Sequence, residues 1–234
     1  AGSGKTRVLT TKIAYLVERL NINPYNILAI TFTNKAAKEM KERIMNMLGI
    51  IGNNIQISTF HSFGLTILRE NYEKLNLKNN FTILDSDDVL SLIKRIMKDK
   101  GIDPKMLAPS YVRNRISFIK NENLSQREIT NLFNTAMEQQ VLNIYETYEE
   151  LIHKNNSVDF DDLLVLPVKL FKEHQEVLEH YQEKFKYILV DEYQDTNEVQ
   201  YQFNKLLAHK YQNLFVVGDA NQSIYGFRNA NFRN

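Results

Sequence analysis

The sequence predicts a mixed α/β fold in which helices flank a parallel sheet and a helical subdomain is inserted into the chain. Two observations lead to this prediction. Continuous apolar runs, typical of buried parallel strands, alternate with helical patterns near both ends of the 234-residue chain. Between them lies a long stretch with helical periodicity throughout. The outer parts therefore form one sheet domain, and the helical part interrupts it.

The first part of the sheet domain alternates between helix and strand. Apolar residues recur with helical spacing from Thr6 to Leu20. The run from Ile27 to Phe32 is typical of a buried parallel strand, and a second helical pattern follows it to about Leu48. A short strand is predicted at Gln56 to Thr59, and a helix from about His61 to Asn71. This order is that of a parallel α/β sheet.

The middle of the chain, from Ser86 to about His174, is predicted to consist of successive helices with no convincing strand. Breaks between helices are expected at Pro104, at Pro109 and in the stretch from Asn121 to Ser125. We interpret this region as a helical insertion, because the strand–helix pattern resumes after it.

The resumed pattern predicts a strand at Lys186 to Val190, a helix from Asn197 to about Ala208 and a strand at Asn213 to Gly218. The predicted domain boundaries are therefore 1–78 for the first part of the sheet domain, 79–166 for the helical insertion and 167–234 for the second part.

Composition excludes several classes of protein. No apolar run approaches the roughly 18 residues of a membrane span, and the N-terminus lacks a signal-peptide pattern, so we expect a cytoplasmic protein with no membrane partner. The chain has no cysteine and five scattered histidines, which excludes disulfides and argues against zinc. A net charge of +1 neither indicates nor excludes nucleic acid. The missing initiator methionine leads us to expect a fragment of a larger protein.

The first six residues, AlaGlySerGlyLysThr, match the end of a P-loop. In the full pattern, backbone N–H groups cradle phosphates, a lysine reaches the β- and γ-phosphates, and a hydroxyl binds Mg²⁺. Gly4, Lys5 and Thr6 fit its last three positions, while its opening glycine would lie two residues before Ala1. Taken alone, these residues could equally be a flexible Gly/Ser/Lys tail.

Two acids follow the strand predicted at the end of the insertion. Asp191 and Glu192 come directly after four apolar residues, and ligands of α/β sheets bind beyond the carboxyl ends of the strands. One carboxylate can hold Mg²⁺, and the next can orient or deprotonate an attacking water. An isolated pair of this kind could instead start a loop or cap a helix. Together with the P-loop residues, the pair indicates nucleotide hydrolysis.

Five segments resemble, in their order and in their amino-acid sequence, the motifs of the UvrD/PcrA/Rep-like superfamily 1 DNA helicases. These segments are GlySerGlyLysThrArg, ThrPheThrAsnLysAlaAla, SerThrPheHisSerPhe, AspGluTyrGlnAspThrAsn and ValValGlyAspAlaAsnGlnSerIleTyrGlyPheArg. The resemblance covers the whole chain and implies a P-loop NTPase (RecA-like) sheet. The helical middle lies where this family inserts its accessory domain 1B. Two departures, Asn221 and Asn229, replace residues common in relatives, and asparagine at the second tolerates the positive φ that a glycine might require.

The resemblance also implies an ATP site that uses Mg²⁺. Lys5 would neutralise the β- and γ-phosphates, and Glu192 would activate the hydrolytic water. The metal would be held by Thr6 and Asp191. Arg228 would lie near the acidic motif. The residues implied to contact ATP are Ala1, Gly2, Ser3, Gly4, Lys5, Thr6, Arg7, which packs on the adenine, and Gln222, which senses the γ-phosphate.

A DNA track is implied in the same way. A motor on single-stranded DNA needs aromatic faces for bases and polar groups for the backbone. The resemblance assigns stacking to Phe32, Tyr225 and Phe227, although Phe32 ends a buried strand and could be a core residue. The implied contacts to the DNA backbone are Thr33, Asn34, Thr59 and His61, of which His61 could also be a cap or a core residue.

The resulting prediction is the N-terminal motor of an ATP-dependent 3′–5′ DNA helicase of DNA repair or replication, acting on single-stranded and duplex-junction DNA. The family's C-terminal motor domains, absent from these residues, would supply arginine fingers in cis, so the chain alone is predicted to be inactive. The alternatives are a motor domain of an AddA/RecB-like helicase–nuclease subunit, a small-molecule P-loop kinase and a catalytically silent DNA-binding module.

Overall fold

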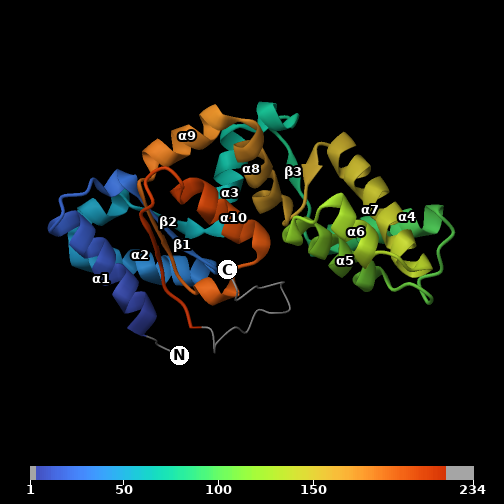
Figure 1. Cartoon of the computed structure of the whole chain (residues 1–234), viewed down its shortest axis with the longest axis horizontal. Coiled ribbons are helices and arrows are strands. Elements are labelled where there is room, and N and C mark those ends of the chain that lie inside the picture. The colour runs from blue at the N-terminus through green and yellow to red at the C-terminus, as the bar shows by residue number, and fades with distance from the viewer. Residues whose placement is uncertain (1–3, 220–234) are drawn as a thin grey trace. The chain divides into compact units, whose positions relative to one another are not determined.

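The computed structural model describes residues 4–219 and divides them into two compact units (Figure 1). The described part of the first unit comprises residues 4–64 and 168–219, and the second unit comprises residues 65–167. Two helices, α3 (Phe60–Glu70) and α8 (Asp162–Glu173), cross the boundary between the units along the sequence.

The first unit contains a four-stranded parallel sheet with the strand order β2-β1-β5-β6. Its strands are β1 (Ile27–Thr31), β2 (Gln56–Thr59), β5 (Tyr187–Val190) and β6 (Leu214–Val216). All five residues of β1 are buried, as a strand covered by helices on both faces requires. The parallel α/β sheet predicted from the sequence is confirmed.

Helices cover both faces of this sheet. On one face α1 (Gly4–Glu18) and α2 (Asn34–Leu48) pack their apolar residues against β1 and β5. Helices α9 (Gln175–Lys184) and α10 (Glu198–Ala208) lie on the other side (Figure 1). There an aromatic cluster fills the core with edge-to-face and stacked contacts, and its members are Phe60, Phe63, Phe171, Tyr181, Phe185 and Phe203. Three short 3₁₀ helices, η1 (Pro24–Asn26), η2 (Gly49–Asn54) and η4 (Tyr193–Asp195), connect the elements.

The second unit is mainly helical. After η3 (Tyr72–Leu75) it contains α4 (Ser86–Asp99), α5 (Pro109–Glu122), α6 (Gln126–Leu132) and α7 (Ala136–Lys154). Apolar residues of α4, α5 and α7 form its core, among them Ile93, Ile116 and Ile144. Pro109 is the first residue of α5, and Asn123, with φ of 49°, ends that helix in the left-handed conformation, so both are true breaks.

The prediction that no strand interrupts the middle region was wrong. Strand β4 (Ser157–Val158) lies within it and pairs in parallel with β3 (Thr82–Ile83). Two residues are too few to produce a visible alternation of apolar and polar positions, so periodicity could not detect these strands. The inserted region is therefore helical with a small two-stranded sheet. Among the described residues, no helix combines the length and the hydrophobicity needed to cross a bilayer.

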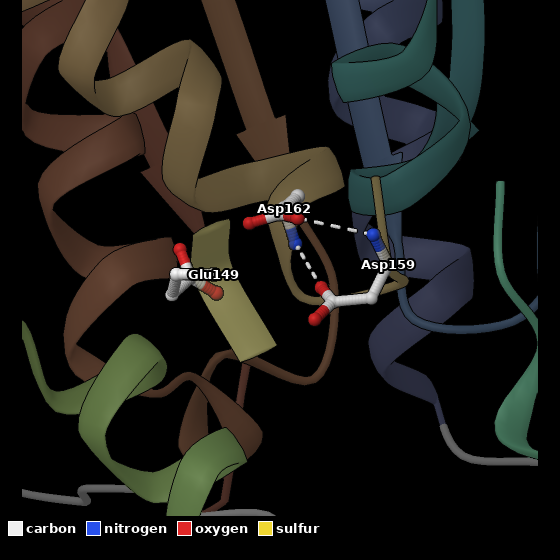
Figure 2. Close-up of side chains that lie close together, drawn as sticks. All are labelled: Glu149, Asp159 and Asp162. Carbon is white, nitrogen blue, oxygen red and sulfur yellow. Dashed lines mark hydrogen bonds between the residues drawn. The ribbon is translucent and has the colours of Figure 1, made fainter. Parts of the chain in front are cut away.

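A buried cluster of charged residues joins several elements of the second unit. Figure 2 shows the carboxyl groups of Glu149, Asp159 and Asp162 close together. One carboxylate oxygen from each of them lies within 4.8 Å of those of the other two. Lys120 Nζ lies 2.9 Å from Glu149 Oε1, 2.8 Å from Asp159 Oδ2 and 2.7 Å from Asp162 Oδ1. The Tyr148 hydroxyl also donates to Asp159 Oδ2 at 2.8 Å. The ammonium of Lys120 thus supplies the counter-charge for three acids, which come from α7, from the segment after β4 and from the first residue of α8.

Burial governs the protonation of this cluster. Lys120, Asp159 and Asp162 are each 5% exposed or less. Loss of hydration raises the pKa of Asp162 to about 7, although the nearby Lys120 ammonium opposes this shift. The attraction of the same ammonium keeps the pKa of Asp159 below its ordinary value. Burial and the Lys120 ammonium therefore act in opposite directions on these two carboxyl groups.

Replacing Lys120 by methionine is expected to destabilise the second unit by about 3 kcal/mol, because removal of one partner leaves buried charges without compensation. Amide hydrogen exchange of α5 and α7 measures this loss as a reduced opening free energy. Lys94→Met, on the exposed side of α4, is the matched control and should leave exchange unchanged. Equal protection in both variants would show that the cluster is not stabilising.

Candidate functional site

The first turn of α1 presents three residues of the predicted phosphate loop. Gly4 begins the helix, and Lys5 and Thr6 follow it. Leu9 and Ile13 are fully buried in the core beneath the sheet, which fixes the direction of the helix. The N–H groups of a first helical turn have no partners within the helix, and the helix dipole places positive charge there. This end of α1 is therefore suited to an anion.

The acidic pair lies where β5 ends. The Asp191 N–H donates to the carbonyl of Ile30 at 3.0 Å, which extends the strand pairing by one residue. Glu192 then adopts a left-handed conformation with φ of 49° and ψ of 44°. Its N–H donates to Asp191 Oδ1 at 2.9 Å, and the following residue, Tyr193, donates to the carbonyl of Val217 at 2.9 Å. The chain thus turns sharply at Glu192, a position where side-chain-bearing residues are strained.

Helix α1 and the end of β5 meet through side-chain contacts. The Thr6 hydroxyl donates to Asp191 Oδ2 at 3.3 Å, and Lys5 Nζ lies 2.9 Å from Glu192 Oε2. The side chain of Lys5 is 14% exposed and that of Glu192 is 35% exposed, so solvent reaches the pair. The structure therefore brings together four residues that the sequence assigned to one site from positions more than 180 residues apart.

The charge state of Asp191 depends on its burial. The residue is 4% exposed, and loss of hydration raises the pKa of its carboxyl, with a further upward contribution from the negative charge of Glu192. The hydrogen bond from Thr6 and the charge of Lys5 act in the opposite direction. A cation at this carboxylate would favour its ionised form.

Gln194 also belongs to this site, and sequence reasoning did not identify it. Its Nε2 donates to Glu192 Oε2 at 2.5 Å, and its Oε1 accepts from the Asp219 N–H at 3.0 Å. A signal was present in the sequence, since Gln194 lies two residues after Glu192 within a single motif. Its partner Asp219, however, comes from the segment after β6, which periodicity alone cannot place.

The described candidates for DNA contact follow the carboxyl ends of β1 and β2. Phe32 is half-buried, and its ring centroid lies 5.4 Å from that of Phe60 in an edge-to-face contact. The hydroxyl of Thr33 accepts from the Ala36 N–H at 3.1 Å and so caps α2. Asn34, the first residue of α2, is exposed. Phe32 thus combines a core contact with partial exposure, and its stacking role stays a prediction.

The two candidates after β2 differ in exposure. Thr59 is 6% exposed, and its hydroxyl accepts from the Ser62 N–H at 3.1 Å and donates to Ser62 Oγ at 2.9 Å. His61 is half-buried in the first turn of α3. The Thr59 hydroxyl therefore stabilises the first turn of α3. A DNA contact by Thr59 or His61 stays a prediction.

Comparison with known proteins identifies the family. The model of the UvrD/REP helicase N-terminal domain matches residues 1–234. The chain belongs to the UvrD/REP helicase family. Among curated relatives, the ATP-dependent DNA helicase PcrA of Bacillus subtilis is 50% identical over 234 residues, and those of Staphylococcus epidermidis and Staphylococcus aureus are 48% identical. Each alignment covers 100% of this chain and 32% of the relative, so the chain spans about a third of these UvrD/REP helicases.

Several residues that the family resemblance assigns to the site lie outside the described part of the chain. They are Ala1, Gly2, Ser3, Gln222, Tyr225, Phe227 and Arg228. Arg7 is described and is exposed on α1, where its carbonyl accepts from the Thr10 hydroxyl at 3.0 Å. Its exposure leaves the guanidinium accessible to a ligand.

Proposed function

We propose that the chain is the first motor domain of an ATP-dependent 3′–5′ DNA helicase, which couples ATP hydrolysis to movement on single-stranded DNA and to duplex unwinding. The observation that carries the proposal is the meeting of Lys5 and Thr6 with Glu192 and Asp191 at the carboxyl edge of a parallel sheet. A phosphate-binding cation, a hydroxyl and two acids are the parts that P-loop phosphoryl transfer requires.

The donor set fits Mg²⁺ and a nucleotide. Thr6 and Asp191 offer hard oxygen atoms 3.3 Å apart, which are the ligand atoms that Mg²⁺ prefers. When bound, Mg²⁺ would neutralise charge on the phosphate oxygens. Lys5 would bind the β- and γ-phosphates together with the N–H groups that begin α1. Arg7 is proposed to pack on the adenine.

Glu192 is proposed as the general base. Its carboxylate would accept a proton from the attacking water, which leaves the carboxyl neutral and the hydroxide ready to attack phosphorus. In the structure, the 2.9 Å contact with Lys5 compensates the charge of this carboxylate. Phosphate oxygens would compete with Glu192 for the ammonium, so substrate binding would free the carboxylate to accept a proton.

The proposed partners are single-stranded and duplex-junction DNA together with further motor domains of the same polypeptide. Support comes from the named helicase relatives and from the 32% of their length that this chain spans. We also propose residues 1–78 and 167–234 as the motor domain and 79–166 as the inserted domain. In the structure, the second compact unit begins at residue 65 and ends at residue 167.

ATP hydrolysis by the full-length protein, with and without single-stranded DNA, tests the proposal. DNA should accelerate hydrolysis, and Lys5→Ala should abolish it, whereas Lys12→Ala, further along α1, should not. Acceleration by a small metabolite in place of DNA would favour a P-loop kinase. Unchanged activity in Lys5→Ala would instead indicate a DNA-binding module without a catalytic role for this site.

A further inference from the structure

We propose that Gln194 is a positioning residue for the Glu192 carboxylate and that it links this carboxylate to the segment that follows β6. The inference rests on the proposed function, in which Glu192 is the general base. Gln194 is assigned no contact with substrate. It acts through Glu192, by a side-chain amide that bridges two segments of the site.

The amide of Gln194 has a donor on one side and an acceptor on the other. Its Nε2 donates to Glu192 Oε2 at 2.5 Å, and its Oε1 accepts from the Asp219 N–H at 3.0 Å. A carboxylate requires a donor and a backbone N–H requires an acceptor, so a glutamine amide satisfies both in one orientation. A glutamate or a methionine at this position could not do so at neutral pH.

Two donors converge on the same oxygen of the base. Lys5 Nζ lies 2.9 Å from Glu192 Oε2, and Gln194 Nε2 contacts this atom as well. When nucleotide phosphates draw Lys5 away, Gln194 would continue to hold the carboxylate in its plane. This orientation leaves Oε1 as the oxygen that we assign to proton acceptance. Positioned carboxylates of this kind gain rate by alignment with the attacking water.

Close packing fixes the position of the bridging amide. Gln194 is 7% exposed and lies in η4, whose first residue is tied to the carbonyl of Val217. A Cβ atom at Gly218 would lie 2.7 Å from Gln194 Oε1 and 3.1 Å from Gln194 N, so this approach leaves no room for a side chain at position 218. A displacement of the backbone at residues 218–219 would therefore move the Gln194 amide with it.

The hydrogen bonds of Gln194 connect the backbone N–H of Asp219 to the Glu192 carboxylate. A displacement of the Asp219 N–H would therefore be transmitted through the Gln194 amide to the Glu192 carboxylate. We therefore expect Gln194 to affect kcat in the presence of DNA more than the affinity for ATP.

The test measures kcat and KM for ATP with the full-length protein and saturating single-stranded DNA. Gln194→Met keeps the length of the side chain and removes its hydrogen bonds to Glu192 and Asp219, together with the 3.4 Å contact of Nε2 with Asp195 Oδ2. It should lower kcat about 10- to 100-fold with KM changed less than about twofold. Gln175→Met, at the exposed start of α9, is the control and should match the unsubstituted protein. Unchanged kcat in Gln194→Met would overturn the proposal.

A second variant covers the case in which Gln194→Met does not fold. Gln194→Glu keeps the acceptor for Asp219 and places a further carboxylate beside those of Glu192 and Asp195, so its kcat should be low at pH 8. The deficit should shrink towards pH 6, because a protonated carboxyl regains a donor. A deficit that is independent of pH would contradict positioning through this hydrogen bond.

The double variant Glu192→Gln with Gln194→Met separates this proposal from the proposed function. If Gln194 acts through Glu192, the double variant should be as slow as Glu192→Gln alone, within about twofold. Full activity in Glu192→Gln would refute the proposed function itself. An impaired Glu192→Gln whose loss adds fully to that of Gln194→Met would refute only the positioning role.

Discussion

Expressed by itself, the 234-residue chain is expected to hydrolyse ATP about 10³- to 10⁵-fold more slowly than the full-length protein, even with saturating single-stranded DNA. The described part of the chain provides a lysine, a hydroxyl and two acids, all on one side of the proposed nucleotide site. The resemblance to superfamily 1 helicases implies that arginine fingers come from a second motor domain, and an arginine finger is typically worth this factor in rate.

Steady-state hydrolysis and nucleotide binding, measured on the same preparation, check this expectation. The isolated chain should bind nucleotide weakly, and Lys5→Ala should weaken that binding further. Amide hydrogen exchange of β1 and β5 controls for misfolding, since these buried strands should be strongly protected. DNA-stimulated turnover by the folded chain at a rate near that of the full-length protein would overturn the prediction.

Glu192→Gln in the full-length protein is expected to lower DNA-stimulated ATP hydrolysis by about 10²- to 10⁴-fold while ATP still binds. Glutamine preserves the shape of the side chain but cannot accept the proton of the attacking water. The contact with Lys5 Nζ would lose its charge, which leaves the ammonium more available to phosphates.

Single-turnover hydrolysis and equilibrium nucleotide binding separate the two effects in this variant. Glu18→Gln, at the exposed C-terminal end of α1, tests the same chemical change on the helix that carries Lys5. It should leave both measurements unchanged. A Glu192→Gln protein that hydrolyses ATP at the normal rate would exclude this residue as the base.

The sheet and its edge could be predicted because their signals are local. The run from Ile27 to Phe32 predicts a strand buried on both faces, and Asp191 with Glu192 follows a second apolar run. Observed element ends differ from the predicted ones by one or two residues, as at Phe32, which lies just beyond β1. Helix and strand ends are set by hydrogen bonding, which a sequence pattern does not show.

Other features depend on contacts between distant segments. Lys120 and Asp162 look like ordinary charged residues in the sequence, where solvated and buried charges cannot be told apart, yet they form a buried ion cluster. The bridge from Gln194 to Asp219 requires the segments after β5 and β6 to approach closely, and Gly218 permits it. Such contacts follow from tertiary packing, which propensity and periodicity do not encode.

The left-handed backbone conformation of Glu192 lowers stability at the residue whose carboxylate is proposed to act in hydrolysis. A side-chain-bearing residue in this conformation is strained by about 1 kcal/mol or more, and glycine would relieve much of it. Glycine, however, has no carboxylate. Selection for thermal stability alone would therefore favour glycine at position 192, whereas the proposed general base requires a carboxylate there. Substitutions chosen only for stability would remove that proposed base.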